Sequence, residues 1–267
     1  MEDNNKRKIK VPVMADLAAE GKKPEYLFWV GSPGSYDDRA KKITRAFVKI
    51  LEHCKVDYAV LGVEETDSGD QARRAGNEFL FQMMAMQNIE VLNGYEVKKI
   101  ITCDPHEYNT LKNEYPDLGG KYEVFHHTEF IDQLIKEGKL KIEDKEFSGK
   151  RITYHDPCYL GRGNEVFEEP RFVLQQLDAE LVEMEQNRER SLCCGAGGAQ
   201  MFKEAEKGDK EIYELRTEQA LDVKPDYIAT ACPFCMTMMQ DGLKMKEKQD
   251  EIKVLDIAEL IALSKNL

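Results

Sequence analysis

The chain of 267 residues carries 38 Lys and Arg against 50 Asp and Glu, which gives a formal net charge of −12 at pH 7. A chain of this length can bury a core without disulfide or metal staples, and its negative charge disfavours nonspecific binding to nucleic acid. Its seven cysteines are an odd number, and residues 1–23 contain no apolar run of signal-peptide length. We therefore expect a cytoplasmic protein without a nucleic-acid partner. No segment has the roughly 20 apolar residues of a membrane helix, so we expect any membrane association to go through a partner in a complex.

Short runs of β-branched and aromatic residues alternate with helical patterns, which predicts an α/β fold built from βα units around mainly parallel sheets. The predicted strands are, in chain order, residues 26–30, 57–61, 97–102, 122–126, 151–155, 181–185, 226–230 and 253–257. Between the first two, residues 37–54 place apolar side chains at steps of three and four, which predicts a helix with Cys54 on its packed face. The Met-rich stretches 81–88 and 236–239 predict core packing.

The two halves of the chain can be aligned with each other. Ser32 lies 35 positions before Asp67, and Cys158 lies 35 positions before Cys193. Further on, IITCDPHE at 100–107 matches IATACPFC at 228–235, with Ile, Thr and Pro shared. A duplicated series of βα units explains this register, and chance similarity is the alternative. Because the polar segment 136–150 lacks apolar periodicity, we predict two pseudo-symmetric lobes, residues 1–140 and 141–267.

The second half contains five cysteines where the aligned positions of the first half have none. They are Cys158, Cys193, Cys194, Cys232 and Cys235. Each group follows a predicted strand or begins a predicted helix, so the fold can bring all five to one edge of a sheet. Cys232 before Pro233 predicts a helix start whose N–H groups point at the sulfurs and stabilise thiolates.

The number of these thiolates bears on what they hold. A structural zinc ion needs four ligands, and adjacent cysteines diverge too much to serve one tetrahedral ion well. Soft thiolates in excess of four therefore favour an iron–sulfur cluster over zinc. Two alternatives stay open: a zinc-stabilised scaffold protein, and a metal-free thiol–disulfide oxidoreductase that uses the Cys232-x-x-Cys235 pair.

The cysteine pattern, together with the segments FWVGSPGSYDDR, ARRAGNEFLFQ, NTLKNEYPDLGG, FHHTEF and HDPCYLGR, resembles the cysteine-rich CCG domain of heterodisulfide reductase catalytic subunits. The resemblance covers nearly the whole chain and extends to membrane-linked oxidoreductases that act beside electron-transfer flavoproteins. It implies two pseudo-symmetric lobes with a noncubane [4Fe-4S] cluster in each lobe whose motif is intact. Here it implies a single cluster, with ligands Cys158, Cys193, Cys194, Cys232 and Cys235.

The resemblance also implies a redox subunit of a larger complex, either an enzyme or only an electron relay. Such a subunit would act on a thiol or disulfide substrate, or link a flavoprotein to a quinone or disulfide pathway. The chain lacks the closely spaced cysteine run of a bacterial ferredoxin, so electrons must arrive from another polypeptide. We expect a ferredoxin-like or flavoprotein partner, and an electron-transfer flavoprotein in particular.

The first half departs from the family pattern at every cluster position. The residues that stand there are Ser32, Asp67, Ser68, Asp104 and Glu107. One interpretation is a hard-metal site formed by Asp67, Asp104, His106 and Glu107. The interpretation that we favour is a capping-box-like helix start, with Asp104 as N-cap and Glu107 as the third helical residue. Without soft ligands we expect no second cluster.

No catalytic group can be assigned from the sequence, but two residues are candidates. His155 nearly adjoins Cys158, so a hydrogen bond from it to a ligating sulfur would tune the cluster, and a purely structural hydrogen bond is the alternative. Cys103 lies beside an aligned ligand position, where it either packs or serves as a redox-active thiol. His126 and His127 precede a helix predicted from Thr128, and we expect one to be packed and the other solvated.

Overall fold

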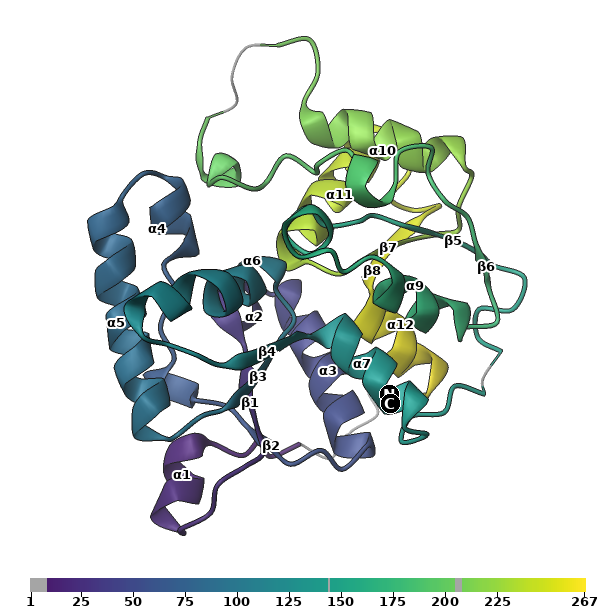
Figure 1. Cartoon of the computed structure of the whole chain (residues 1–267). Coiled ribbons are helices and arrows are strands. Elements are labelled where there is room, and N and C mark those ends of the chain that lie inside the picture. Colours follow the sequence, from purple (N-terminus) through teal and green to yellow (C-terminus); the bar gives the residue numbers. More distant parts are fainter. Residues whose placement is uncertain (1–8, 144, 205–207) are drawn as a thin grey trace, which may run out of the picture.

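The computed structural model describes residues 9–143, 145–204 and 208–267. Residues 1–8 of the N-terminal stretch and residue 144 of the boundary segment lie outside the described residues. The described strands form two parallel four-stranded sheets of order β2-β1-β3-β4 and β6-β5-β7-β8 (Figure 1). Their bounds are β1 Tyr26–Trp29, β2 Tyr58–Ala59, β3 Lys99–Thr102, β4 Glu123–His126, β5 Arg151–Tyr154, β6 Glu180–Leu181, β7 Tyr227–Thr230 and β8 Lys253–Asp256.

Helices connect successive strands on both faces of the sheets. In the first half they are α1 Met14–Ala19, α2 Gly31–Tyr36, α3 Ala40–His53, α4 Asp70–Arg74, α5 Glu78–Gly94, α6 Pro105–Asn109 and α7 His127–Lys136. In the second half they are α8 Gly161–Asn164, α9 Glu168–Gln175, α10 Ile212–Asp222, α11 Pro233–Met245 and α12 Ile257–Ser264. A π-helical turn, η2, follows α6 at Thr110–Glu114. No described helix is both long and apolar enough to cross a membrane.

The predicted α/β fold and the predicted pseudo-symmetry of two lobes are confirmed, because the two sheets share one strand order. The central pairs correspond as well: Leu27 pairs with Ile100 between β1 and β3, and Ile152 pairs with Tyr227 between β5 and β7. The central strands are almost wholly buried, as helix-covered parallel strands are. The carboxyl ends of the strands in each sheet meet at one edge, where loops can carry a site.

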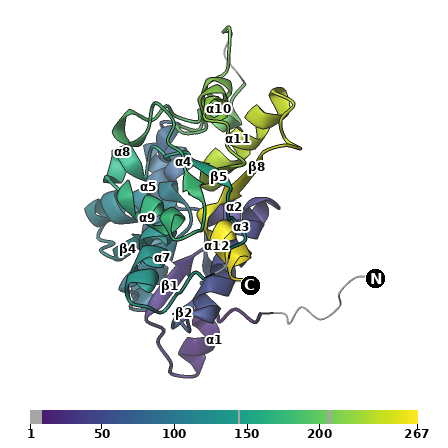
Figure 2. The ribbon, with the colours of Figure 1, turned by 90° about the vertical axis from the view of Figure 1, so that its right-hand side faces the viewer.

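The two sheets are joined by helices that pack across the interface between them. In Figure 1, α3, α7 and α12 lie between the sheets, with α3 packed on α12 and α7 packed on α9. At this interface His127 Nε2 lies 2.9 Å from Asp256 Oδ1, and both side chains are fully buried. Arg39 forms a two-pronged ion pair with Glu259 at 2.7 and 2.8 Å. Figure 2 shows the resulting long axis, with α10 and α11 at one end and α1 at the other.

Two local expectations are wrong. His126 and His127 are both fully buried, because His126 caps α7 and His127, rather than Thr128, is its first residue. In α5 the Met-rich stretch is only partly packed, since Met83 and Met86 are 55% and 60% exposed. The other Met-rich stretch, on α11, packs as predicted: Met236 and Met239 are fully buried.

Candidate metal centre at the facing edges of the two sheets

The structure brings the sulfur atoms of the five cysteines together at the carboxyl edge of the second sheet. Cys158 follows β5, the Cys193-Cys194 pair lies in the long loop after β6, and Cys232 follows β7 as the N-cap of α11. The Sγ atoms of Cys193 and Cys158 are 3.9 Å apart, and those of Cys194 and Cys235 are 3.3 Å apart. Cys194, Cys232 and Cys235 are buried, whereas Cys158 and Cys193 are partly exposed.

A left-handed glycine shapes the turn that carries the adjacent cysteines. Gly195 has φ +89°, and a Cβ atom placed on it would lie only 3.1 Å from Ile212 Cβ. In this conformation its backbone N–H donates to Cys193 Sγ at 3.3 Å. Gly69 repeats the turn in the first lobe, with φ +88° and an N–H that donates to Asp67 Oδ1 at 2.8 Å. Glycine adopts this backbone conformation without the steric cost that a side chain would bring.

The crowding of these thiols favours loss of protons from some of them. Hydrogen bonds from the thiols of Cys158 and Cys194 hold the pKa of Cys193 far below its usual range. Burial alone would raise the pKa of Cys232, but hydrogen bonds with Cys235 and His106 lower it to about 5. The group is therefore prepared to present thiolates, which are the form of cysteine that binds metals.

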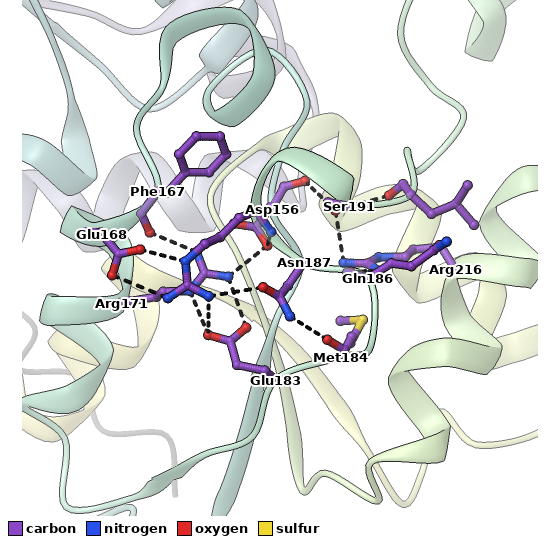
Figure 3. A network of polar contacts seen from close by, with 12 residues as sticks. Asp156, Phe167, Glu168, Arg171, Glu183, Met184, Gln186, Asn187, Ser191 and Arg216 are labelled. Atoms are coloured by element: carbon purple, nitrogen blue, oxygen red, sulfur yellow. Dashed lines mark hydrogen bonds and ion pairs between the residues drawn. The ribbon is translucent and has the colours of Figure 1, made fainter.

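A buried network of charged residues fixes the loops that carry Cys158 and Cys193 (Figure 3). Arg171, almost inaccessible to solvent, donates two hydrogen bonds to Asp156 at 2.7 and 2.9 Å and also contacts Glu183. The backbone carbonyl of Asp156 accepts a hydrogen bond from the Ser191 hydroxyl at 3.3 Å. Asp156 thus ties the two cysteine-bearing loops together. No sequence pattern singled out Arg171, because it lies in an ordinary amphipathic helix.

A second buried arginine holds His155 in one orientation. Arg216 Nε donates to His155 Nδ1 at 2.9 Å, so the hydrogen of the neutral imidazole is on Nε2. Nε2 has no hydrogen-bond partner in the structure, and a ring nitrogen of His155 lies within 4.8 Å of the sulfurs of Cys194 and Cys235. Burial and the neighbouring guanidinium lower the pKa of His155 to about 3, so the ring is uncharged.

Arg216 is also unusual for its lack of a carboxylate partner. The side chain is fully buried, yet it forms no ion pair with any described carboxylate. Its other hydrogen bonds go to uncharged oxygens: the Ser191 hydroxyl at 3.1 Å, the Gln186 carbonyl at 2.8 Å and Gln219 Oε1 at 2.7 Å. A buried charge needs compensation nearby. The thiols of Cys194 and Cys235 are the groups beside it that acquire negative charge when they bind a metal.

The first lobe contributes a histidine to the same centre. His106, in the first turn of α6, lies with Nδ1 3.0 Å from Asp70 Oδ2 and hydrogen-bonds to the thiol of Cys232. Its ring stacks on Tyr159 at a centroid distance of 4.2 Å and meets the Phe234 ring edge-on at 4.9 Å. Burial would lower the pKa of His106, but the bonds to Asp70 and Cys232 raise it well above the usual value.

The residues of the first lobe that align with the five cysteines are called the vacant motif: Ser32, Asp67, Ser68, Asp104 and Glu107. One contact between two of the cysteines is repeated there by oxygen atoms. Ser32 Oγ donates to Asp67 Oδ2 at 2.7 Å, at the positions that align with Cys158 and Cys193. Among the described residues, the convergent group at this edge is Asp104, His106 and Cys232, with ligand atoms within 4.8 Å of one another. The four residues of the hard-metal interpretation therefore do not converge on one point.

The predicted helix cap at Asp104 is confirmed, and the capping box is wrong. Asp104 Oδ1 accepts the backbone N–H of His106 at 2.9 Å, and Pro105 is the first helical residue. The N–H of Asp104 donates to Thr102 Oγ1 at 3.2 Å rather than to Glu107. Glu107 instead turns into the space beside the other residues of the vacant motif. Cys103 is 5% exposed and packs in the core, where burial raises the pKa of its thiol well above the usual value.

Comparison with known proteins places the chain in a family. Residues 29–112 and 152–240 match the cysteine-rich domain (CCG) family, and the chain belongs to it. The chain is 51% identical over 255 residues to the probable iron-sulfur-binding oxidoreductase FadF of Bacillus subtilis, covering 95% of this chain and 36% of that protein. It is 45% identical over 251 residues to the EtfAB:quinone oxidoreductase of Syntrophomonas wolfei, covering 92% and 35% respectively. The chain thus spans about a third of the length of these two relatives.

More distant comparisons agree with this placement. One subunit of the dihydromethanophenazine:CoB–CoM heterodisulfide reductase of Methanosarcina barkeri is 33% identical over 271 residues, covering 98% of this chain and 63% of that protein. A hypothetical protein from Helicobacter pylori has the same fold, with a TM-score of 0.59 at 9% identity over 92% of this chain and 50% of that one. The chain is therefore a cysteine-rich (CCG) domain protein, related to proteins that are named as an iron–sulfur-binding oxidoreductase and a heterodisulfide reductase subunit.

Proposed function

We propose that this chain is a one-cluster redox subunit. One noncubane [4Fe-4S] cluster would be held by Cys158, Cys193, Cys194, Cys232 and Cys235, and would relay electrons between a flavoprotein or ferredoxin-like partner and a quinone or disulfide pathway. The observation that carries the proposal is the convergence of five sulfur atoms at one sheet edge, while the matching edge of the other sheet presents oxygen ligands. When bound, such a cluster supplies one-electron chemistry.

The buried surroundings of the sulfurs support a thiolate-bound cluster. Arg216 places an unpaired positive charge beside Cys194 and Cys235, which offsets the negative charge of metal-bound thiolates. His155 presents a ring nitrogen within 4.8 Å of the sulfurs of Cys194 and Cys235. His106, from the first lobe, presents one as close to the sulfur of Cys232. We assign both as positioning residues whose N–H groups donate to sulfur, because such bonds set the reduction potential of an iron–sulfur centre.

The two alternatives from the sequence account for fewer of these features. A thiol–disulfide oxidoreductase needs an accessible thiolate, whereas Cys232 and Cys235 are 1% and 3% exposed. A structural zinc ion takes four ligands and would leave one of the five cysteines without a role. The relatives that carry the words quinone and heterodisulfide in their names make those two pathways the first acceptors to test.

An electron-transfer assay tests the proposal. Protein purified without oxygen is mixed with a reduced electron-transfer flavoprotein, and bleaching of the visible iron–sulfur absorption is followed in a stopped-flow instrument. We expect about one electron to be accepted per chain. A Cys193→Ala variant should accept fewer electrons per chain, because it lacks a cluster ligand and loses or converts the cluster. Absence of any electron uptake by fully loaded wild-type protein, from flavoprotein and reduced ferredoxin alike, would contradict the relay.

A further inference from the structure

A cavity of about 330 Å³ lies between the two lobes, beside the proposed cluster site. The vacant motif of the first lobe forms one wall through Ser32, Asp67 and Glu107. The opposite wall comes from α11 of the second lobe and includes Phe234, which stands between two of the clustered cysteines. This volume is within the range of small-molecule sites. A group held here would adjoin the turn that carries Cys232 and Cys235.

The polar wall of the cavity contains hydrogen-bond acceptors without partners. Glu107 is only 4% exposed, and its Oε2 atom has no hydrogen-bond partner among the described residues. Burial and the carboxylates of Asp104 and Asp67 raise the pKa of Glu107 well above its usual value, so a cation bound beside it would take the place of a proton. Gln71 Oε1 is likewise buried and has no hydrogen-bond partner among the described residues. The Nε2 group of the same side chain donates to Asp70 at 3.2 Å, which fixes the orientation of the amide. Buried polar atoms are normally paired, so two orphaned oxygens on one wall indicate a missing donor.

The charges of the residues that line the cavity also favour a ligand that donates hydrogen bonds. Four acidic residues line the cavity, and no Lys, Arg or His is among the described residues that line it. The charge of Asp70 is balanced by Arg74 and His106, whereas the carboxylate of Asp67 accepts, among the described residues, only from the Ser32 hydroxyl and the Gly69 N–H. An anionic ligand would therefore be repelled, and a cationic one would find an uncompensated carboxylate.

The remaining walls are apolar and aromatic. Pro33, Ala40, Met201 and Phe234 line the cavity, and Phe202 lies at its edge with 66% of its surface exposed. Apolar walls can pack against the hydrocarbon part of a ligand, and the faces of aromatic rings also attract cations. A divalent metal fits poorly, because no three of the described carboxylates that line the cavity bring their oxygen atoms within 4.8 Å of one another.

We propose that this cavity binds a primary ammonium group carried on an apolar body. The N–H groups of the ammonium would donate to Glu107, Gln71 and Asp67, while the hydrocarbon part packs on Pro33 and Phe234. The ligand is either a free aliphatic or arylalkyl amine, or a lysine side chain of a protein that docks at the cluster. The first lobe would then use the positions of its replaced cluster ligands to bind this group.

Three probes of similar size and different head group test this proposal: 2-phenylethylammonium, 2-phenylethanol and 3-phenylpropionate. Binding to the anaerobically purified protein is measured by calorimetry and by ligand-observed NMR. We expect the ammonium to bind at least tenfold more tightly than the alcohol, and the carboxylate not to bind. Equal affinity for alcohol and ammonium, preference for the carboxylate, or no binding of any probe at millimolar concentration would overturn the proposal.

Two variants locate the binding. Glu107→Gln should weaken the ammonium at least tenfold, and Ala40→Leu, which replaces a methyl by an isobutyl group in the cavity, should weaken all binding. The control is Asp132→Asn, which removes a buried carboxylate that pairs with Lys136 on α7, outside the cavity. If Glu107→Gln does not fold, Ala40→Leu still decides the site. Unchanged affinity in the folded cavity variants would place the amine elsewhere and overturn the proposal.

A final pair of probes separates the two sources of the ammonium. N-acetyl-lysinamide presents a lysine side chain on a backbone, and N-acetyl-norleucinamide is its uncharged counterpart. Tighter binding of the lysine probe than of 2-phenylethylammonium identifies a partner's side chain as the ligand. The reverse order identifies a small amine. Equal and weak binding of the lysine and norleucine probes, with no preference for the charged group, counts against the site.

Discussion

Two side chains lie at the candidate centre although the sequence did not associate them with the cysteines. His106 reaches Cys232 from the first lobe, and Arg216 holds His155 from α10. Neither could be predicted, because each contact depends on how distant segments of the chain come together. The five cysteines were different, since their positions after successive strands of one parallel sheet fixed their common location in advance. Sequence therefore predicts the sulfurs of this site well and the residues around them poorly.

The ligand assignment makes a prediction about single cysteines. Cys193→Ala and Cys194→Ala should each lose the cluster or convert it to another form, because each removes one sulfur from the converging group. Cys54→Ala should keep it, since Cys54 is a partly buried residue that packs against the core of the first lobe. Iron content and the visible spectrum of the three purified variants provide the measurement. Equal cluster content in all three would count against the assignment.

The contact between the lobes predicts a change in reduction potential. The hydrogen bond from His106 to Cys232 stabilises negative charge on the sulfur, so it favours the reduced centre. His106→Phe should therefore lower the potential by roughly 60 mV, the one-electron equivalent of a tenfold change. An EPR-monitored redox titration measures this shift. His53→Gln, at an exposed position at the end of α3, is the control and should leave the potential unchanged, and an unaltered potential in His106→Phe would remove its role in positioning.

At the scale of elements, the strands were the most predictable part of the molecule. Seven of the eight predicted strands overlap observed strands by two residues or more, because apolar β-branched runs between polar segments identify buried parallel strands. The eighth, predicted over 181–185, is wrong except at Leu181, since β6 is the short and partly exposed pair Glu180–Leu181. The helix over residues 37–54 is shorter than predicted and begins at Ala40, since Asp37 Oδ1 accepts the Ala40 N–H at 2.7 Å. The short helices α2, α4 and α6 have too few residues for periodicity to reveal them. Core packing was predicted for the Met-rich face of α5, but part of this face is exposed.

A carboxylate at the end of β1 predicts a pH dependence of stability. Glu65 accepts the N–H groups of Gly31 and Val30 at 2.6 and 3.1 Å. Burial raises the pKa of Glu65 to about 7, although these two hydrogen bonds oppose the shift. A carboxyl with a raised pKa binds its proton more tightly in the folded state. The free energy of unfolding should therefore fall as the pH rises from the usual carboxyl range through 7.

Glu65→Gln isolates this contribution. The variant has no proton to lose at this position, so its free energy of unfolding should fall less steeply with pH than that of the wild type. Between pH 5 and pH 8 the difference between the two proteins should change by about 2–3 kcal/mol in favour of the variant. Urea unfolding at the two pH values measures it. A difference that stays constant would show that Glu65 titrates in its ordinary range.

At the scale of the whole molecule, the two lobes depend on each other. The helices α3 and α12 pack between the sheets, and the His127–Asp256 contact at their interface is fully buried. The internal alignment predicted two similar lobes. It did not predict that their carboxyl edges face each other, because a duplicated motif specifies the lobes and not the interface between them. That arrangement is what places His106 and the ammonium cavity beside the cysteines.

This dependence predicts cooperative unfolding. The single tryptophan, Trp29, is fully buried in the first lobe, whereas visible iron–sulfur absorption reports on the second. Urea transitions followed by these two signals should coincide. Arg39→Met should lower the free energy of unfolding by about 1–2 kcal/mol, because it breaks the partly buried pair with Glu259. Both urea midpoints should therefore fall together. Lys22→Met, which breaks an exposed pair with Glu20, should shift neither. Separate transitions would mean that the lobes unfold independently.

Counting metal ions shows whether the second lobe holds one iron–sulfur cluster and the first lobe none. Iron and acid-labile sulfide are measured per chain, together with an EPR spectrum, on protein purified without oxygen. We expect about four irons and four sulfides, with a spectrum unlike that of a cubane cluster. Eight irons would place a second cluster in the first lobe, and one zinc ion or no metal would contradict the redox function altogether.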